Sequence, residues 1–177
     1  MGSPLVLVLG GTRSGKSRHA LELTRGWAGD GRAWFLATAW SGDPELDARI
    51  ELHRAHRPRA WPTVEVGTDL AGAVRSTVPG EPLLVDGLTL WLSALAGDEP
   101  VDLEPILVGP VDAALHALTE RDGPVCVVSD ELGVGMAPLD PGARAFRDLT
   151  GLVHQAFAAA ADEVRFVIAG LPVRLKP

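Results

Sequence analysis

A glycine-rich segment near the start of the chain carries the residues best suited to chemistry. It consists of Gly10, Gly11, Thr12, Arg13, Ser14, Gly15, Lys16 and Ser17. This spacing fits the phosphate-binding P-loop, G-x-x-x-x-G-K-[ST], whose backbone N–H groups surround an anion. We expect the Lys16 ammonium to contact the β- and γ-phosphates of a nucleoside triphosphate, and the Ser17 hydroxyl to ligate Mg²⁺. An ordinary glycine-rich turn is disfavoured by the apolar run Leu5–Leu9 before the segment and the helical pattern after it.

Polar residues close three other apolar runs. Asp86 follows the run 83–85 in the manner of a Walker B acid, which holds Mg²⁺ directly or through water. An aspartate that only caps the next helix would suit the same position. Thr38 ends the run 33–38, and Ser129, Asp130 and Glu131 end the run that begins at residue 125. Because parallel α/β sheets bind ligands beyond the carboxyl ends of their strands, we expect these residues to border the site.

Residues 49–59 concentrate basic side chains in a chain that is otherwise acidic. The segment contains four arginines and two histidines. At helical spacing Arg49, His53 and Arg57 share one face, with His56 close to it, and such a face is able to surround phosphate groups. A solvated basic helix end, favoured by the helix dipole, accounts for the same composition equally well.

Apolar runs alternate with helical patterns along the chain. The expected strands are 5–9, 33–38, 63–66, 82–85, 125–129, 164–168 and 173–175. The expected helices are 16–27, 44–56, 69–76, 88–95, 103–119 and 142–160. Together with the P-loop, this alternation predicts an α/β fold of the P-loop NTPase (RecA-like) type. We expect a mainly parallel sheet covered by helices on both faces, with an antiparallel strand at the C-terminus.

Length and composition suit one domain, residues 1–177, with a substantial core. The formal net charge of −7 argues against a broad surface for nucleic acid or anionic membranes. Cys126 is the only cysteine, which excludes an intramolecular disulfide. The first residues lack a signal-peptide pattern, and no apolar run approaches the roughly 18–20 residues of a membrane span. We therefore expect a cytoplasmic protein.

Five blocks occur in order along nearly the whole chain. They are the P-loop extended to Ala20; Ala37-Thr38-Ala39; His53-Arg54-x-x-Arg57-Pro58-x-x-Trp61-x-Thr63-x-Glu65; Val85-Asp86-Gly87-Leu88-Thr89-Leu90-Trp91; and Asp130-Glu131-Leu132-Gly133-Val134-Gly135-Met136-x-Pro138, which leads to Arg144-x-Phe146-Arg147-Asp148. With the closing run 158–164, these blocks resemble the bifunctional adenosylcobinamide kinase/adenosylcobinamide-phosphate guanylyltransferase family of cobalamin biosynthesis. The histidine block is far more specific than a P-loop alone.

The resemblance implies two reactions. In the first, a nucleoside triphosphate, ATP or GTP, phosphorylates the aminopropanol hydroxyl of adenosylcobinamide. In the second, the histidine that matches His53 attacks the α-phosphate of GTP and releases pyrophosphate. The resulting GMP–histidine phosphoramidate passes GMP to the cobinamide phosphate, giving adenosylcobinamide-GDP. A neutral imidazole is a competent nucleophile near neutral pH, so the chemistry suits the residue.

The resemblance also implies a set of site residues and an assembly. Along the GTP site it places Ala37, Thr38, Ala39, Arg54, Ala55, His56, Arg57, Glu65 and Asp86. It implies that His53 and Lys16 act in catalysis and that Ser17 and Asp86 bind the magnesium ion. It also implies that the protein is a homotrimer. Glu65, expected to be buried, would accept hydrogen bonds from guanine or from ribose hydroxyls. His56, three residues from His53, is the alternative nucleophile.

Several residues stand outside this scheme. His116 and His154 fall in predicted helices away from every motif and are interpreted as structural or surface residues, and His19 as a packing or helix-face residue. Four residues depart from the family pattern. Asparagine is usual at the positions of Asp130, Ala94 and His154, and cysteine is usual at the position of Gly87. Asp130 adds charge close to the loops expected to face the corrinoid. Two other functions remain open: a small-molecule kinase without guanylyl transfer, and a GTP-binding regulatory module.

Overall fold

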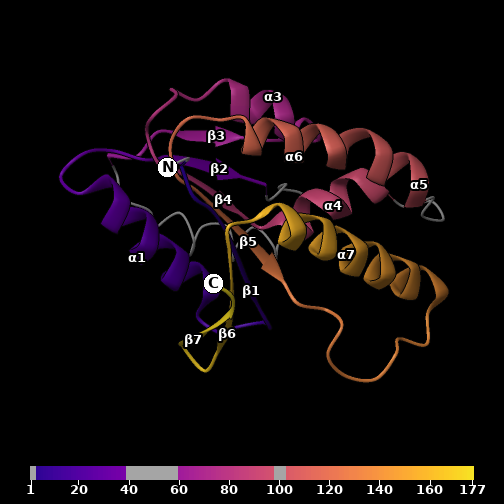
Figure 1. Cartoon of the computed structure of the whole chain (residues 1–177). Coiled ribbons are helices and arrows are strands. Elements are labelled where there is room, and N and C mark those ends of the chain that lie inside the picture. The colour runs from indigo at the N-terminus through magenta and orange to yellow at the C-terminus, as the bar shows by residue number, and fades with distance from the viewer. Residues whose placement is uncertain (1–2, 39–59, 98–102) are drawn as a thin grey trace.

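One seven-stranded sheet organises the computed structural model, which describes residues 3–38, 60–97 and 103–177. The strands are β1 (Leu5–Gly10), β2 (Trp34–Ala37), β3 (Thr63–Glu65), β4 (Leu83–Asp86), β5 (Val125–Asp130), β6 (Glu163–Ile168) and β7 (Leu171–Lys176). Their order across the sheet is β3-β2-β4-β5-β1-β6-β7 (Figure 1). Neighbouring strands run parallel except for β6 and β7, which are antiparallel. The predicted α/β sheet with an antiparallel C-terminal strand is confirmed.

Helices cover both faces of the sheet. They are α1 (Lys16–Ala28), α3 (Leu70–Arg75), α4 (Leu88–Ala96), α5 (Leu103–Ile106), α6 (Asp112–Thr119) and α7 (Pro141–Ala160). Helix α1 packs on the face that presents Val6 and Val8, whereas α3, α4, α6 and α7 pack on the face that presents Leu7. Within the described parts of the chain, no helix is long and apolar enough to cross a membrane.

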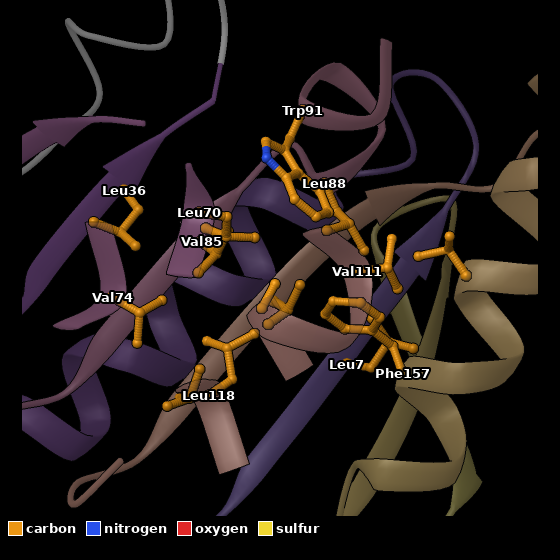
Figure 2. Packing of buried hydrophobic residues seen from close by; sticks show 14 of the residues in the cluster. Leu7, Leu36, Leu70, Val74, Val85, Leu88, Trp91, Val111, Leu118 and Phe157 are labelled. Carbon is orange, nitrogen blue, oxygen red and sulfur yellow. The ribbon is translucent and has the colours of Figure 1, made fainter. Parts of the chain in front are cut away.

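The larger core lies between the sheet and the helices on the side opposite α1, where strand and helix residues interdigitate (Figure 2). Leu7 and Val85 come from β1 and β4, the strands on either side of β5, and Trp91 and Phe157 come from α4 and α7. All four side chains are at most 1% exposed. Strand residues alternate between the two faces because successive side chains of a strand point in opposite directions. The central strands are therefore apolar on both faces, as the continuous apolar runs predicted.

The predicted helix 103–119 is interrupted. Leu107–Val111 forms a π-helical turn, η1, between α5 and α6. Pro110 lies inside this turn. A proline cannot donate the backbone hydrogen bond and its ring crowds the preceding turn, so a regular α-helix is disrupted there. The prediction of one uninterrupted helix was wrong at this point.

Candidate functional site

The carboxyl ends of the central strands meet at one edge of the sheet. Gly10, the last residue of β1, lies opposite Asp130, the last residue of β5. On the other side, Ala37 of β2 lies opposite both Asp86 of β4 and Glu65 of β3. Residues that are far apart in the sequence therefore border one edge, where parallel α/β sheets bind ligands.

The glycine-rich segment connects β1 to α1 in the conformation that a P-loop requires. Gly15 has a φ of +92°, in the left-handed region that favours glycine. A Cβ on Gly10 would lie 2.7 Å from the carbonyl oxygen of Val167, so the loop also passes too close to β6 for a side chain. The turn after β6 supports the loop, because the Gly170 N–H donates to the Ser14 carbonyl at 2.7 Å. Thr12 and Arg13 are exposed on the outer side of the loop.

The Lys16 ammonium is already paired with a carboxylate. Its Nζ lies 2.5 Å from Asp130 Oδ1 and 3.3 Å from the Gly11 carbonyl oxygen. The two side chains are 12% and 31% exposed, so the pair is partly shielded from water. The sequence placed Asp130 near the predicted site but did not show this contact. In the structure, Asp130 faces the P-loop lysine.

Ser17 and Asp86 lie together at the start of α1. The Ser17 hydroxyl donates to Asp86 Oδ1 at 3.1 Å. Two hard oxygen donors beside the expected phosphate position fit the preference of Mg²⁺, which is usually held by one or two protein oxygens and substrate phosphates. The two predicted magnesium ligands are thus brought together, and their chemistry suits the ion.

Side-chain hydrogen bonds link the end of β2 to the end of β4. The Thr38 hydroxyl lies 2.9 Å from the Asp86 carbonyl oxygen and 2.6 Å from that of Gly87. Gly87 has a φ of +102°, and a Cβ there would lie 2.7 Å from Thr38 Oγ1. A glycine at position 87 therefore suits both the backbone and the space available.

Glu65 is not buried, contrary to our expectation. It ends the three-residue strand β3, which lies at the edge of the sheet, and its side chain is exposed. A short edge strand has a neighbour on one side only and does not enclose its terminal residue. Its register beside Ala37 nevertheless keeps it at the same edge as Asp86.

His154 is not remote from the motifs, contrary to its interpretation from the sequence. It comes from α7 and is 6% exposed. Its Nε2 lies 2.7 Å from Ser129 Oγ, and its Nδ1 lies 3.4 Å from Glu131 Oε2. By contrast, His116 is exposed and pairs at 3.0 Å with Glu120, four residues later and just after the last residue of α6. His19 packs beside Arg165, with its Nε2 3.0 Å from Nη1.

The buried position of His154 has a consequence for stability. Burial lowers the pKa of His154, and the charges of Glu131 and Asp130 oppose this effect only in part. In the unfolded chain its pKa returns to about 6.5. The unfolded state then binds more protons as the pH falls through the interval below this value, so the free energy of unfolding decreases toward acid.

We predict that the wild type loses more stability than His154→Asn between about pH 7.5 and pH 5.5. Urea unfolding of both proteins across this range measures the difference. Direct comparison with the variant is needed because burial and Arg165 also lower the pKa of His19. A stability difference that is independent of pH would contradict the assignment.

The Lys16–Asp130 pair yields a second prediction. Nucleotide phosphates compete with Asp130 for the Lys16 ammonium and are repelled by its charge. Asp130→Asn is therefore expected to tighten nucleoside triphosphate binding by about three- to tenfold, the scale of one partly screened charge interaction. Titration with a fluorescent nucleotide measures Kd, and the exposed Asp30→Asn, which makes the same change in charge, is the control. Unchanged or weaker binding in Asp130→Asn would show that phosphate does not displace the carboxylate.

The remaining predicted site residues lie outside the described residues. They are Ala39, His53, Arg54, Ala55, His56 and Arg57. Their roles stay predictions. The structure does describe the residues that follow them, where Trp61 is buried on the α1 side of the sheet and leads into β3.

Known proteins match this sequence over nearly their whole length. The bifunctional adenosylcobalamin biosynthesis protein CobP of Pseudomonas aeruginosa is 44% identical over 173 residues, covering 96% of this chain and 96% of its own. The corresponding protein CobU of Escherichia coli K12 is 36% identical over 184 residues, covering 97% of this chain and 99% of its own.

Structural similarity extends to a more distant protein. The flagellar accessory protein FlaH of Methanocaldococcus jannaschii superposes with a TM-score of 0.53 at 13% identity, covering 98% of this chain and 78% of that one, which supports the P-loop NTPase fold. The family described as cobinamide kinase / cobinamide phosphate guanyltransferase matches residues 6–175. With a complete P-loop at the carboxyl edge of the sheet and this match along the chain, the protein belongs to the cobinamide kinase / cobinamide phosphate guanyltransferase family.

Proposed function

We propose that this protein catalyses two successive transfers to a corrinoid. It phosphorylates the aminopropanol hydroxyl of adenosylcobinamide with ATP or GTP. It then transfers GMP from GTP, through a covalent GMP–His53 intermediate, to the cobinamide phosphate and releases pyrophosphate. The observation that carries the proposal is the presence of two pairs, Lys16 with Asp130 and Ser17 with Asp86, at one sheet edge in a chain of this family.

The phosphoryl transfer uses the P-loop. Its backbone N–H groups and the start of α1 bind phosphate oxygens, and Lys16 leaves Asp130 to neutralise charge on the transferred group. Ser17 and Asp86 are the proposed Mg²⁺ ligands, and the hydrogen bond between them supports this assignment. When bound at such sites, this ion shields phosphate charge and orients the leaving group.

The guanylyl transfer uses a nucleophile. The neutral His53 imidazole forms a bond to the α-phosphorus of GTP as the bond to the bridging oxygen breaks and pyrophosphate leaves. The phosphate oxygen of the cobinamide phosphate then displaces the histidine. Splitting one displacement into two easier ones is the general advantage of covalent catalysis. The proposed GTP-binding residues are the P-loop with Ala37, Thr38, Ala39, Arg54, Ala55, His56, Arg57, Glu65 and Asp86.

Product analysis tests the proposal. The purified protein is incubated with Mg²⁺, adenosylcobinamide and either ATP or GTP, and the corrinoids are separated and identified by mass. We expect a phosphorylated corrinoid with a competent donor, and the GDP-linked corrinoid with pyrophosphate when GTP is present. A phosphorylated product alone would favour the plain kinase, and nucleotide binding without any product would favour the regulatory module. Sedimentation of the same sample tests the proposed homotrimer.

A further inference from the structure

In the part of the chain that the structure describes, the carboxylates of Asp86, Asp130 and Glu131 border the phosphate loop, and the first two are hydrogen-bonded to groups of the nucleotide site. Asp130 pairs with Lys16, and Asp86 accepts the Ser17 hydroxyl. Glu131 is different. Its backbone N–H donates to the Gly10 carbonyl at 3.0 Å, which places it directly beside the first P-loop residue. Among the described residues, no lysine or arginine lies within 4.0 Å of its carboxylate oxygens.

The Glu131 carboxylate is held in place at both oxygens. Oε1 accepts the Gly133 N–H at 2.5 Å, and Oε2 lies 3.4 Å from His154 Nδ1. The side chain is 21% exposed, so it is open to a ligand. Each carboxylate oxygen has two lone pairs, and no second hydrogen bond from a described residue occupies either oxygen, so both can accept a substrate proton.

A buried chain of hydrogen bonds orients the histidine that holds Glu131. His154 Nε2 lies 2.7 Å from Ser129 Oγ, and Ser129 Oγ lies 2.9 Å from Thr89 Oγ1. Thr89 Oγ1 in turn accepts the Asp130 N–H at 2.9 Å. Ser129 is fully buried and Thr89 is 8% exposed, so neither relies on solvent for its hydrogen bonds.

These hydrogen bonds can run in two directions, because each hydroxyl group can both donate and accept. In one direction, Thr89, which accepts from the Asp130 N–H, donates to Ser129, and Ser129 donates to His154 Nε2. The imidazole then carries its proton on Nδ1, facing Glu131. A protonated His154 would reverse the chain and leave the Thr89 proton only the Asp130 carbonyl oxygen, 3.4 Å away. The arrangement favours a neutral histidine whose N–H points at Glu131.

We propose that Glu131 is the general base for the acceptor hydroxyl in the phosphoryl transfer, and that His154 is the positioning residue that fixes it. The inference rests on the proposed kinase reaction. In the step, the acceptor O–H bond breaks and its proton passes to the Glu131 carboxylate. The acceptor oxygen forms a bond to the γ-phosphorus, the bond from that phosphorus to the bridging oxygen breaks, and the nucleoside diphosphate leaves with the electron pair.

Glu131→Gln separates this role from nucleotide binding. Two reactions are measured on each protein: phosphorylation of adenosylcobinamide from a γ-labelled donor, and labelling of the protein itself by α-labelled GTP. The second reaction needs no acceptor hydroxyl. We expect Glu131→Gln to lower kcat of phosphorylation by about 10²–10⁴-fold, the usual contribution of a general base. Its self-labelling should stay within about threefold of wild type, since the nucleotide ligands are intact.

A pair of His154 variants tests positioning against mere structural support. The asparagine amide reaches the place of Nδ1 and can donate to Glu131, whereas the glutamine amide reaches the place of Nε2 and contacts Ser129 instead. We expect His154→Asn to keep the phosphorylation kcat within about threefold of wild type, and His154→Gln to lower it by about tenfold or more with KM for the nucleotide unchanged. The exposed His116→Asn is the matched control.

Each result decides the inference. The role of Glu131 as the base is overturned if Glu131→Gln phosphorylates the corrinoid at a rate within threefold of wild type. It is also overturned if Glu131→Gln loses phosphorylation and self-labelling equally, because self-labelling does not need the base. Equal kcat values for the two His154 variants overturn the positioning role. A wild type that binds nucleotide but phosphorylates no corrinoid overturns the proposed kinase function itself, a failure that is visible before any variant is compared.

Discussion

Lys16→Ala is expected to lower kcat/KM for nucleotide-dependent phosphorylation by about 10²–10³-fold. Removing one preorganised donor from charge that develops in a transition state typically has this effect. The ammonium of Lys16 lies beside the Gly11 carbonyl within the loop that receives the phosphates, so no other described lysine can replace it. Initial rates with varied nucleotide measure the loss.

Lys176→Ala is the matched control, because Lys176 is the only other lysine of the chain. Its ammonium donates to the carbonyl oxygens of Ala158, Ala159 and Ala161 at the end of α7. That variant should lose about 1 kcal/mol of stability and retain its activity. A Lys16→Ala protein that is folded and within about threefold of wild-type kcat/KM would contradict the role of the loop.

Trp91→Ala is expected to destabilise the fold by about 3–5 kcal/mol, a large share of the total stability of a domain this size. The Trp91 side chain is fully buried, and its Nε1–H donates to the Thr68 carbonyl at 3.0 Å (Figure 2). Truncation leaves a cavity beneath α4 and an unsatisfied carbonyl group. Urea unfolding measures the change in the free energy of unfolding.

The half-buried Trp27 of α1 provides the comparison. Trp27→Ala removes the same side chain from a site that is open to solvent, so it should cost less than half as much as Trp91→Ala. A cost of under about 1.5 kcal/mol for Trp91→Ala would show that the helices on the side opposite α1 collapse around the cavity.

Local patterns were sufficient to predict the sheet and the nucleotide loop. Apolar runs located the central strands most clearly, because β1 and β5 are buried on both faces. The P-loop was predictable because its glycines, lysine and serine act through a fixed local backbone. The proline at position 110 was the missed local signal, and it accounts for the π-helical turn within the predicted helix.

Contacts across the sheet could not be predicted in the same way. The pairing of Lys16 with Asp130 joins residues 114 positions apart, and it depends on β1 and β5 being neighbours in register. The contact of His154 with Ser129 depends on which side of α7 faces the sheet. Tertiary packing decides this, and the local sequence does not. Burial of Glu65 was wrongly expected because strand length and edge position are not visible in a motif.

The covalent guanylyl-histidine is the central claim, and labelling with α-phosphate-labelled GTP tests it most directly. Wild type and His53→Ala are incubated with Mg²⁺ and the labelled nucleotide, then separated under denaturing conditions. We predict label on the wild type that survives denaturation, is released by acid, and is absent from His53→Ala. Label retained by His53→Ala would place the nucleophile elsewhere, with His56 the first alternative. A folded, GTP-binding wild type that takes up no label would contradict guanylyl transfer through histidine.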